Sequence, residues 1–266
     1  MILTAENYHS IEANKAYMSV SQLKAFDECE AAAMAQINGL YRNTKTTSLL
    51  VGGYVDAFFA GELEQYKEEN PEIFCKNGTL CAEYKKADLI IERIQSDEYF
   101  YSFMAGGEIQ PIMTGTIAGV EFKIKIDFLH DDKIVDLKIM KDFAPIYLPN
   151  RGRVNFIEAW HYDLQGAIYQ EIVRQNIGKR LPFYINAATK EEETDLANIP
   201  VPQEVLEYEL ESAIERIPYY HAVKTGVFEP ERCGVCNYCK RTKKLTGSVT
   251  WDSLCNNDFS KDVEER

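Results

Sequence analysis

The chain has 266 residues, of which 45% are hydrophobic and 27% are charged, so it is long enough to bury the core of one large domain. Its formal net charge of −13 argues against broad, non-specific attraction to nucleic acids. No stretch approaches the roughly 20 apolar residues of a membrane span, and the N-terminus lacks the basic start and apolar run of a secretory signal. We therefore expect a cytoplasmic protein with no membrane partner.

Helical periodicity dominates the first hundred residues. Residues 19–37 are predicted to form one helix, because a serine near its start can cap it and apolar residues recur at helical spacing. Two further helices are predicted over residues 46–62 and 82–95. Residues 1–105 are therefore expected to be mainly helical.

From Glu108 the apolar period changes to two, which is typical of β-strands. We predict three antiparallel strands within residues 108–140, joined by turns at Ala118–Gly119 and Asp131–Asp132. The elements predicted after them are a helix over residues 155–176, an apolar strand over 181–189 and a helix over 202–226.

Helices on either side of a mixed sheet define an α/β fold. We interpret residues 1–245 as one domain, with its sheet-and-helix core in residues 106–190. Residues 191–245 would add a C-terminal helix and a cysteine cluster, and residues 246–266 are expected to form a mobile tail.

Acidic and basic residues alternate with apolar ones in the segment "KIDFLHDDKIVDLKIM", residues 125–140. A turn at Asp131–Asp132 would place Asp127 directly opposite Asp136, with Lys138 on the same face. Opposed carboxylates repel each other at this range, and a hard divalent cation such as Mg²⁺ between them would remove the repulsion. A solvated hairpin whose charges face water is the alternative.

The order of the polar motifs resembles the PD-(D/E)xK nuclease superfamily, in particular its RecB-like branch. The motifs are Asp56 after a glycine pair, Asp127, Asp136-x-Lys138 and, four apart on the next helix, Gln165 and Tyr169. Phage exonucleases of the RecE type and CRISPR-associated adaptation nucleases are the most similar groups. The resemblance covers residues 19–244 and implies a restriction-endonuclease-like core.

The resemblance also implies roles for these residues. Asp127 and Asp136 would bind Mg²⁺ or Mn²⁺, with the Leu137 carbonyl completing the shell of ligands. Lys138 would position and activate the attacking water, while Gln165 and Tyr169 would orient the substrate and the site. Many relatives carry a histidine at the position of Asp56, which is therefore a further candidate metal ligand. The implied reaction is hydrolysis of DNA phosphodiesters.

Three cysteines near the C-terminus have the spacing C-x₂-C-x₂-C, at Cys233, Cys236 and Cys239. This run can wrap three corners of an iron–sulfur cube. The resemblance implies Cys29 as the fourth ligand, because iron–sulfur members of the branch carry an isolated N-terminal cysteine. A [4Fe-4S] cluster is the first expectation, Zn²⁺ in a Cys₄ site is its rival, and free thiols are the third reading. The cysteines expected to lack any partner are Cys75, Cys81 and Cys255.

Four basic side chains are expected to contact DNA phosphates: Lys123, Lys125, Arg151 and Arg153. Three functions fit the motifs. The first is a Mg²⁺-dependent exonuclease of phage recombination, working with a single-strand annealing protein. The second is a CRISPR-adaptation-like nuclease with the same chemistry, and the third is a non-catalytic nucleic-acid-binding subunit. The complete acid–acid–lysine set argues against the third, and an oligomer is compatible with all of them.

Overall fold

A computed structural model describes residues 1–149 and 151–248. The helices are α1 (Ile11–Ala16), α2 (Val20–Glu28), α3 (Glu30–Ile37), α4 (Thr47–Ala60), α5 (Leu63–Glu69), the 3-10 turn η1 (Pro71–Ile73), α6 (Ala82–Ser96), α7 (Glu98–Ser102), α8 (Phe156–Ala159), α9 (Tyr162–Ile177), α10 (Gln203–Lys224) and α11 (Asn237–Arg241). The strands are β1 (Glu108–Ile109), β2 (Ile112–Ile117), β3 (Val120–Lys125), β4 (Phe128–Leu129), β5 (Ile134–Met140), β6 (Ile146–Leu148), β7 (Gly152–Val154), β8 (Phe183–Thr189) and β9 (Leu196–Pro200).

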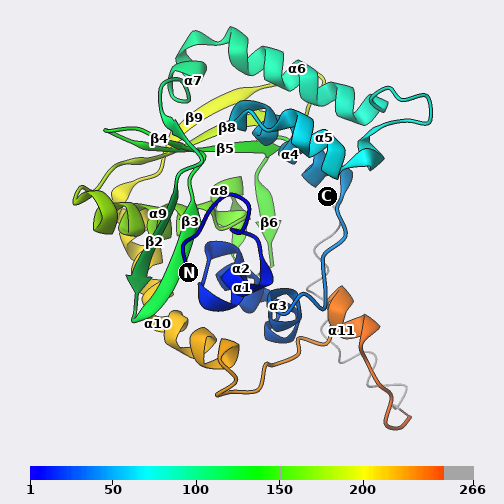
Figure 1. Cartoon of the computed structure of the whole chain (residues 1–266), viewed down its shortest axis with the longest axis vertical. Coiled ribbons are helices and arrows are strands. Elements are labelled where there is room, and N and C mark those ends of the chain that lie inside the picture. The colour runs from blue at the N-terminus through cyan, green and yellow to red at the C-terminus, as the bar shows by residue number, and fades with distance from the viewer. Residues whose placement is uncertain (150, 249–266) are drawn as a thin grey trace.

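A five-stranded mixed sheet forms the centre, in the order β1–β4–β5–β8–β9. Strands β5 and β8 pair in parallel, and the other neighbours are antiparallel. Helices α4 and α6 lie on one side of this sheet, and α8, α9 and α10 lie on the other (Figure 1). The expected α/β class is confirmed.

Strand β5 is buried on both faces, because helices cover both sides of the sheet. Val135 and Leu137 pack into a core with residues of α4 and α6. Ile134 faces the other way and packs into the core built with α9 and α10. Asp136 shares the α9 side with Ile134, so the fold itself brings a carboxylate into an apolar interior.

Helices α4, α6 and α10 and strand β8 lie within two residues of their predicted bounds. The other two predicted helices are each divided. Helix 19–37 is interrupted at Cys29, which is extended at φ −169° and ψ 109°, and helix 155–176 is interrupted at Trp160–His161. His161 adopts the left-handed conformation at φ 53°. Both breaks occur where the segment meets distant parts of the chain, and helical periodicity does not record such contacts.

The middle one of the three predicted strands, between the turns at Ala118–Gly119 and Asp131–Asp132, is also divided, at Ile126–Asp127. Strand β3 therefore pairs with β2 in a separate hairpin, closed at the predicted Ala118–Gly119 turn. Strand β4 joins the central sheet instead, where Leu129 pairs with Ile134 around the predicted turn at Asp131–Asp132.

A disulfide joins Cys75 to Cys81 in the loop between η1 and α6, so the expectation that neither has a partner is wrong. A β-bridge between Phe74 and Leu80 brings these positions together. Cys255 and most of the expected tail lie outside the described residues. Among the residues that the structure describes, none of the helices combines the length and apolar character needed to cross a bilayer.

Candidate active site

Two acidic side chains meet where strands β4 and β5 separate. Phe128 pairs with Val135, and this register continues to place Asp127 opposite Asp136, as the sequence predicts. The backbone N–H of Leu137 donates a 2.9 Å hydrogen bond to Oδ2 of Asp127, which fixes that carboxylate against β5. The two acids therefore lie side by side on neighbouring strands.

Asp136 is only 1% exposed and has two close partners. Its Oδ1 accepts a 2.6 Å hydrogen bond from Nε2 of Gln165 on α9. Its Oδ2 forms an ion pair with Nζ of Lys138, but no well-aligned hydrogen bond from a described residue reaches this oxygen. Lys138 also donates to the Leu137 carbonyl at 3.3 Å. One lone pair of a buried carboxylate is thus left for a further ligand.

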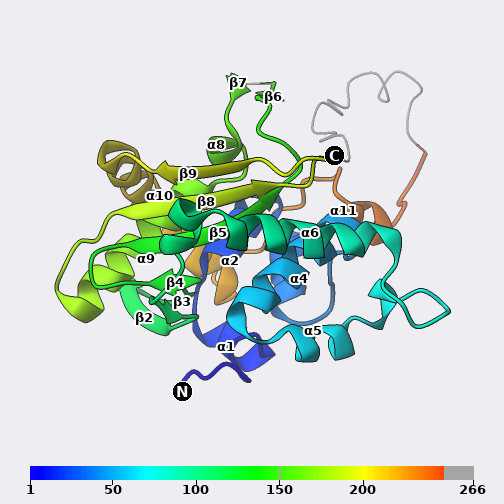
Figure 2. The same cartoon turned by 90° about the horizontal axis from the view of Figure 1, so that it is seen from above.

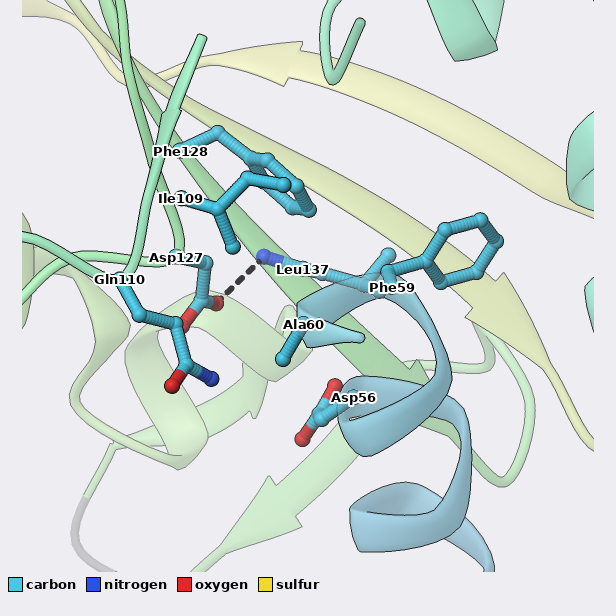
Figure 3. A pocket seen from close by; sticks show the side chains of 8 residues that line it. All are labelled: Asp56, Phe59, Ala60, Ile109, Gln110, Asp127, Phe128 and Leu137. Atoms are coloured by element: carbon cyan, nitrogen blue, oxygen red, sulfur yellow. Dashed lines mark hydrogen bonds between the residues drawn. The ribbon is translucent and has the colours of Figure 1, made fainter. Parts of the chain in front are cut away.

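A third carboxylate, Asp56, comes from helix α4 and lines a small pocket with Asp127 and Gln110. Figure 3 shows the polar ends of these three side chains turned toward a common space, with the Leu137–Asp127 hydrogen bond at its rim. Gln110 adopts a left-handed backbone at φ 52°, and its N–H donates to the Asp127 carbonyl at 3.1 Å. Such strain is often found at functional sites.

The electrostatics of this space favour a cation. Loss of surrounding water and the negative charge of Asp136 raise the pKa of Asp127 well above its usual value. The same causes raise the pKa of Asp56 to about 7, although part of its side chain remains open to solvent, which moderates the effect. Burial alone would lower the pKa of Lys138, but the charges of Asp136 and Asp127 raise it above its ordinary value. The negative charges of Asp56, Asp127 and Asp136 are therefore close to the positive charge of Lys138.

Tyr169, four residues after Gln165, performs a different task from its neighbour. Its hydroxyl donates a 3.0 Å hydrogen bond to the carbonyl of Lys125, at the end of β3. Burial raises the pKa of Tyr169, which keeps the phenol protonated. Tyr169 thus anchors the segment that leads into Asp127.

Lys24 and Tyr162, which the sequence prediction did not name, lie beside Lys138. Nζ of Lys24 on α2 donates a 2.7 Å hydrogen bond to the carbonyl of Trp160, at the end of α8. Lys24 and Lys138 both approach the ring of Tyr162, at 4.9 and 5.1 Å from its centroid. Burial and the charge of Lys138 lower the pKa of Lys24 to about 8. The contact spans 136 residues, so no local pattern could have identified Lys24.

The four basic residues predicted to contact DNA are placed very differently. Lys123 is 2% exposed, and its Nζ donates hydrogen bonds to the Tyr8 carbonyl and to Oδ1 of Asn14. The predicted contact of Lys123 with a DNA phosphate is therefore wrong, because its side chain is buried. Lys125 is half-buried near the site, while Arg151 and Arg153 are exposed. The last two belong to the β6–β7 hairpin, which projects from the body of the protein (Figure 2).

The four predicted metal-binding cysteines converge although they come from opposite ends of the chain. The Sγ atoms of Cys29, Cys233, Cys236 and Cys239 all lie within 4.8 Å of one another. Cys29 supplies its sulfur from the break between α2 and α3, and the other three belong to the segment around α11. The quartet predicted from the resemblance is therefore assembled.

Over residues 19–242 the chain matches the profile of a family described as a PDDEXK-like domain of unknown function. The chain belongs to this family. A crystal structure of a "Putative exonuclease" from Eubacterium rectale matches this PDDEXK-like domain with a TM-score of 0.93 and 43% identity, covering 97% of this chain and 99% of that chain. The search of curated proteins finds no match. The mixed sheet and its flanking helices thus form the restriction-endonuclease-like core of PDDEXK nucleases. The comparisons support a nuclease activity for this chain.

Proposed function

We propose that the protein is a Mg²⁺-dependent DNA exonuclease, for which Mn²⁺ can substitute. The observation that carries the proposal is the grouping of three acids. Asp56 and Asp127 line one small pocket, and Asp136, ion-paired with Lys138, lies close enough for its charge to raise the pKa of both. A protein that only binds DNA would gain nothing from concentrating acids where a phosphate must approach.

The residues present fit a hard divalent cation. Lys138 is the ion-pair partner of Asp136, and the pKa values of Asp56 and Asp127 are raised by burial and by the charge of Asp136, so the three acids bring more negative charge together than this one lysine balances. The three carboxylates and the Leu137 carbonyl supply the oxygen ligands that Mg²⁺ prefers. When bound, Mg²⁺ would supply positive charge next to the scissile phosphate and lower the pKa of a coordinated water.

The chain's own residues would then act on the attacking water and on the phosphate. Lys138, kept charged by the two adjacent aspartates, would donate to the attacking oxygen and stabilise its negative charge. Gln165 holds Asp136 in one orientation. Lys125, Arg151 and Arg153 would neutralise phosphates of the bound strand.

We further propose that the enzyme degrades DNA from its ends, as in phage-type recombination, and that it delivers single strands to an annealing protein. The similar protein from Eubacterium rectale is described as a "Putative exonuclease", which supports the preference for ends. The alternative, a nuclease of CRISPR adaptation, would use the same chemistry.

The test is incubation of the purified protein with end-labelled linear DNA and with closed-circular DNA, each with Mg²⁺ and with EDTA. We expect Mg²⁺-dependent loss of the linear DNA and an intact circle. Asp136→Asn and Lys138→Met should each abolish cleavage without unfolding the protein. Asp132→Asn, on the exposed turn of the same hairpin, is the matched control and should retain full activity. Cleavage of the circle would contradict the exonuclease assignment, and an active Asp136→Asn enzyme would contradict the site.

A further inference from the structure

The sulfur quartet is more compact than the expected iron–sulfur cluster allows. Sγ of Cys29 lies 3.6 Å from Sγ of Cys239, and Sγ of Cys233 lies 4.0 Å from the same atom. No pair among the four exceeds 4.8 Å.

These separations distinguish between two kinds of metal centre. A single tetrahedral ion with metal–sulfur bonds of about 2.3 Å holds its four sulfurs about 3.8 Å apart. In a [4Fe-4S] cluster each thiolate binds a different iron and points away from the centre, so the sulfurs are roughly 6 Å apart. The sulfur–sulfur separations observed here are close to those around a single ion, and all are shorter than those around a [4Fe-4S] cluster.

The surroundings of the quartet resist expansion. Cys29 and Cys239 are 5% and 2% exposed, and alanines of α3 pack beside them. The N–H of Cys236 donates to Sγ of Cys233, and the N–H of Cys239 donates to Sγ of Cys236, each at 3.4 Å. Such N–H···S bonds stabilise thiolates that bind a metal. Opening the quartet for a cube would break these contacts.

Backbone pairing also holds the two ends of the chain together beside the sulfurs. The N–H of Ala31 donates to the carbonyl of Glu231 at 2.9 Å, and the N–H of Glu231 donates to Oε2 of Glu30 at 2.8 Å. The site is therefore built by tertiary contacts as well as by the sulfurs themselves.

We propose that the four cysteines bind one Zn²⁺ ion, in place of a [4Fe-4S] cluster. The ion joins Cys29, at the break between α2 and α3, to the C-terminal segment. Because α2 carries Lys24 into the candidate active site, the ion also anchors one wall of that site from a distance. This structural role does not depend on the proposed nuclease activity.

The primary test is metal analysis of the wild-type protein, purified with and without oxygen from cells supplied with both iron and zinc. We expect one zinc per chain, no acid-labile sulfide and no absorbance band at about 400 nm. X-ray absorption at the zinc edge should show four sulfur ligands at about 2.3 Å. Iron with labile sulfide, a single iron, or a metal-free protein with four reactive thiols would each overturn the proposal.

A variant pair separates the site from general effects of losing cysteines. Cys233→Ser should lose the zinc and lower the unfolding temperature, whereas Cys75→Ser combined with Cys81→Ser should keep one zinc per chain, because that pair lies outside the quartet. If Cys233→Ser does not fold, the wild-type metal content and absorption spectrum decide the question. None of these readouts uses DNA cleavage, so a failure here is distinct from a failure of the proposed function.

Discussion

Nε2 of Gln165 donates a 2.6 Å hydrogen bond to Oδ1 of Asp136, although 29 residues separate them in the chain. The bond links helix α9 to strand β5 and leaves the second oxygen of Asp136 directed at Lys138. The orientation of the central carboxylate is therefore set by a helix that lies outside the sheet carrying it.

Replacing this amide by a carboxylate tests that relationship. Gln165→Glu keeps the shape of the side chain but removes the donor and adds a negative charge next to Asp136. We expect kcat for DNA cleavage to fall at least about tenfold, which corresponds to about 1.4 kcal/mol. The unfolding midpoint, measured in parallel, should change little. Unaltered kcat in a folded Gln165→Glu protein would show that the hydrogen bond does not matter for catalysis.

Lys24 should contribute to DNA binding rather than to the chemical step. In Lys24→Gln we expect KM for DNA to rise several-fold, kcat to change little, and the salt dependence of binding to weaken by about one phosphate contact. Because the pKa of Lys24 is lowered to about 8, kcat/KM of the wild type should decline as the pH rises through that value. That decline should be smaller in the variant. A loss of kcat as severe as that of Lys138→Met would refute this assignment.

Gly166 should be essential for the approach of α9 to the sheet. A Cβ at this position would lie 2.5 Å from Cδ1 of Phe183 and 2.9 Å from Cδ2 of Leu206, closer than buried atoms can pack. Gly166→Ala should therefore lower the free energy of unfolding by about 1–3 kcal/mol, as measured by urea denaturation. Gly52→Ala on α4 is the matched control, because a Cβ there meets no atom within 4 Å. It should be neutral or stabilising by up to about 1 kcal/mol, and equal effects of the two variants would contradict the packing argument.

The metal-free protein should lose stability as the pH rises. The pKa of Asp56 is about 7 in the folded protein and 3.8 in the unfolded chain, so between these values the folded state holds a proton that the unfolded state has released. Stability from this group is therefore present below about pH 4 and lost as the pH rises through about 7; Asp127 shifts in the same direction.

Asp56→Asn isolates this effect, because asparagine cannot release the proton. In EDTA, unfolding curves of the wild type and of this variant should agree below about pH 4, and the variant should be the more stable at about pH 8. Mg²⁺ should stabilise the wild type more at the higher pH, where protons no longer compete for the carboxylates. If the difference in stability between the wild type and the variant in EDTA does not change with pH, proton uptake by Asp56 is excluded.

Local patterning was sufficient for the central hairpin. The period of two, the turn at Asp131–Asp132 and the resulting register predicted the juxtaposition of Asp127 and Asp136, because cross-strand neighbours follow from a few adjacent residues. The helices α4, α6 and α10 were likewise predictable from their own periodicity and ends. The division of the strand at Ile126–Asp127 was not predictable, because it depends on which of two sheets each half joins.

Contacts between distant segments decided the rest. Lys123 was predicted to contact DNA, yet the N-terminal segment covers it, and its Nζ donates hydrogen bonds inside the protein instead. The breaks at Cys29 and at Trp160–His161, the position of Lys24 and the spacing of the four sulfurs all arise where segments more than a hundred residues apart meet. Periodicity reports which face of an element is buried but not what covers it, so these features could come only from the folded chain.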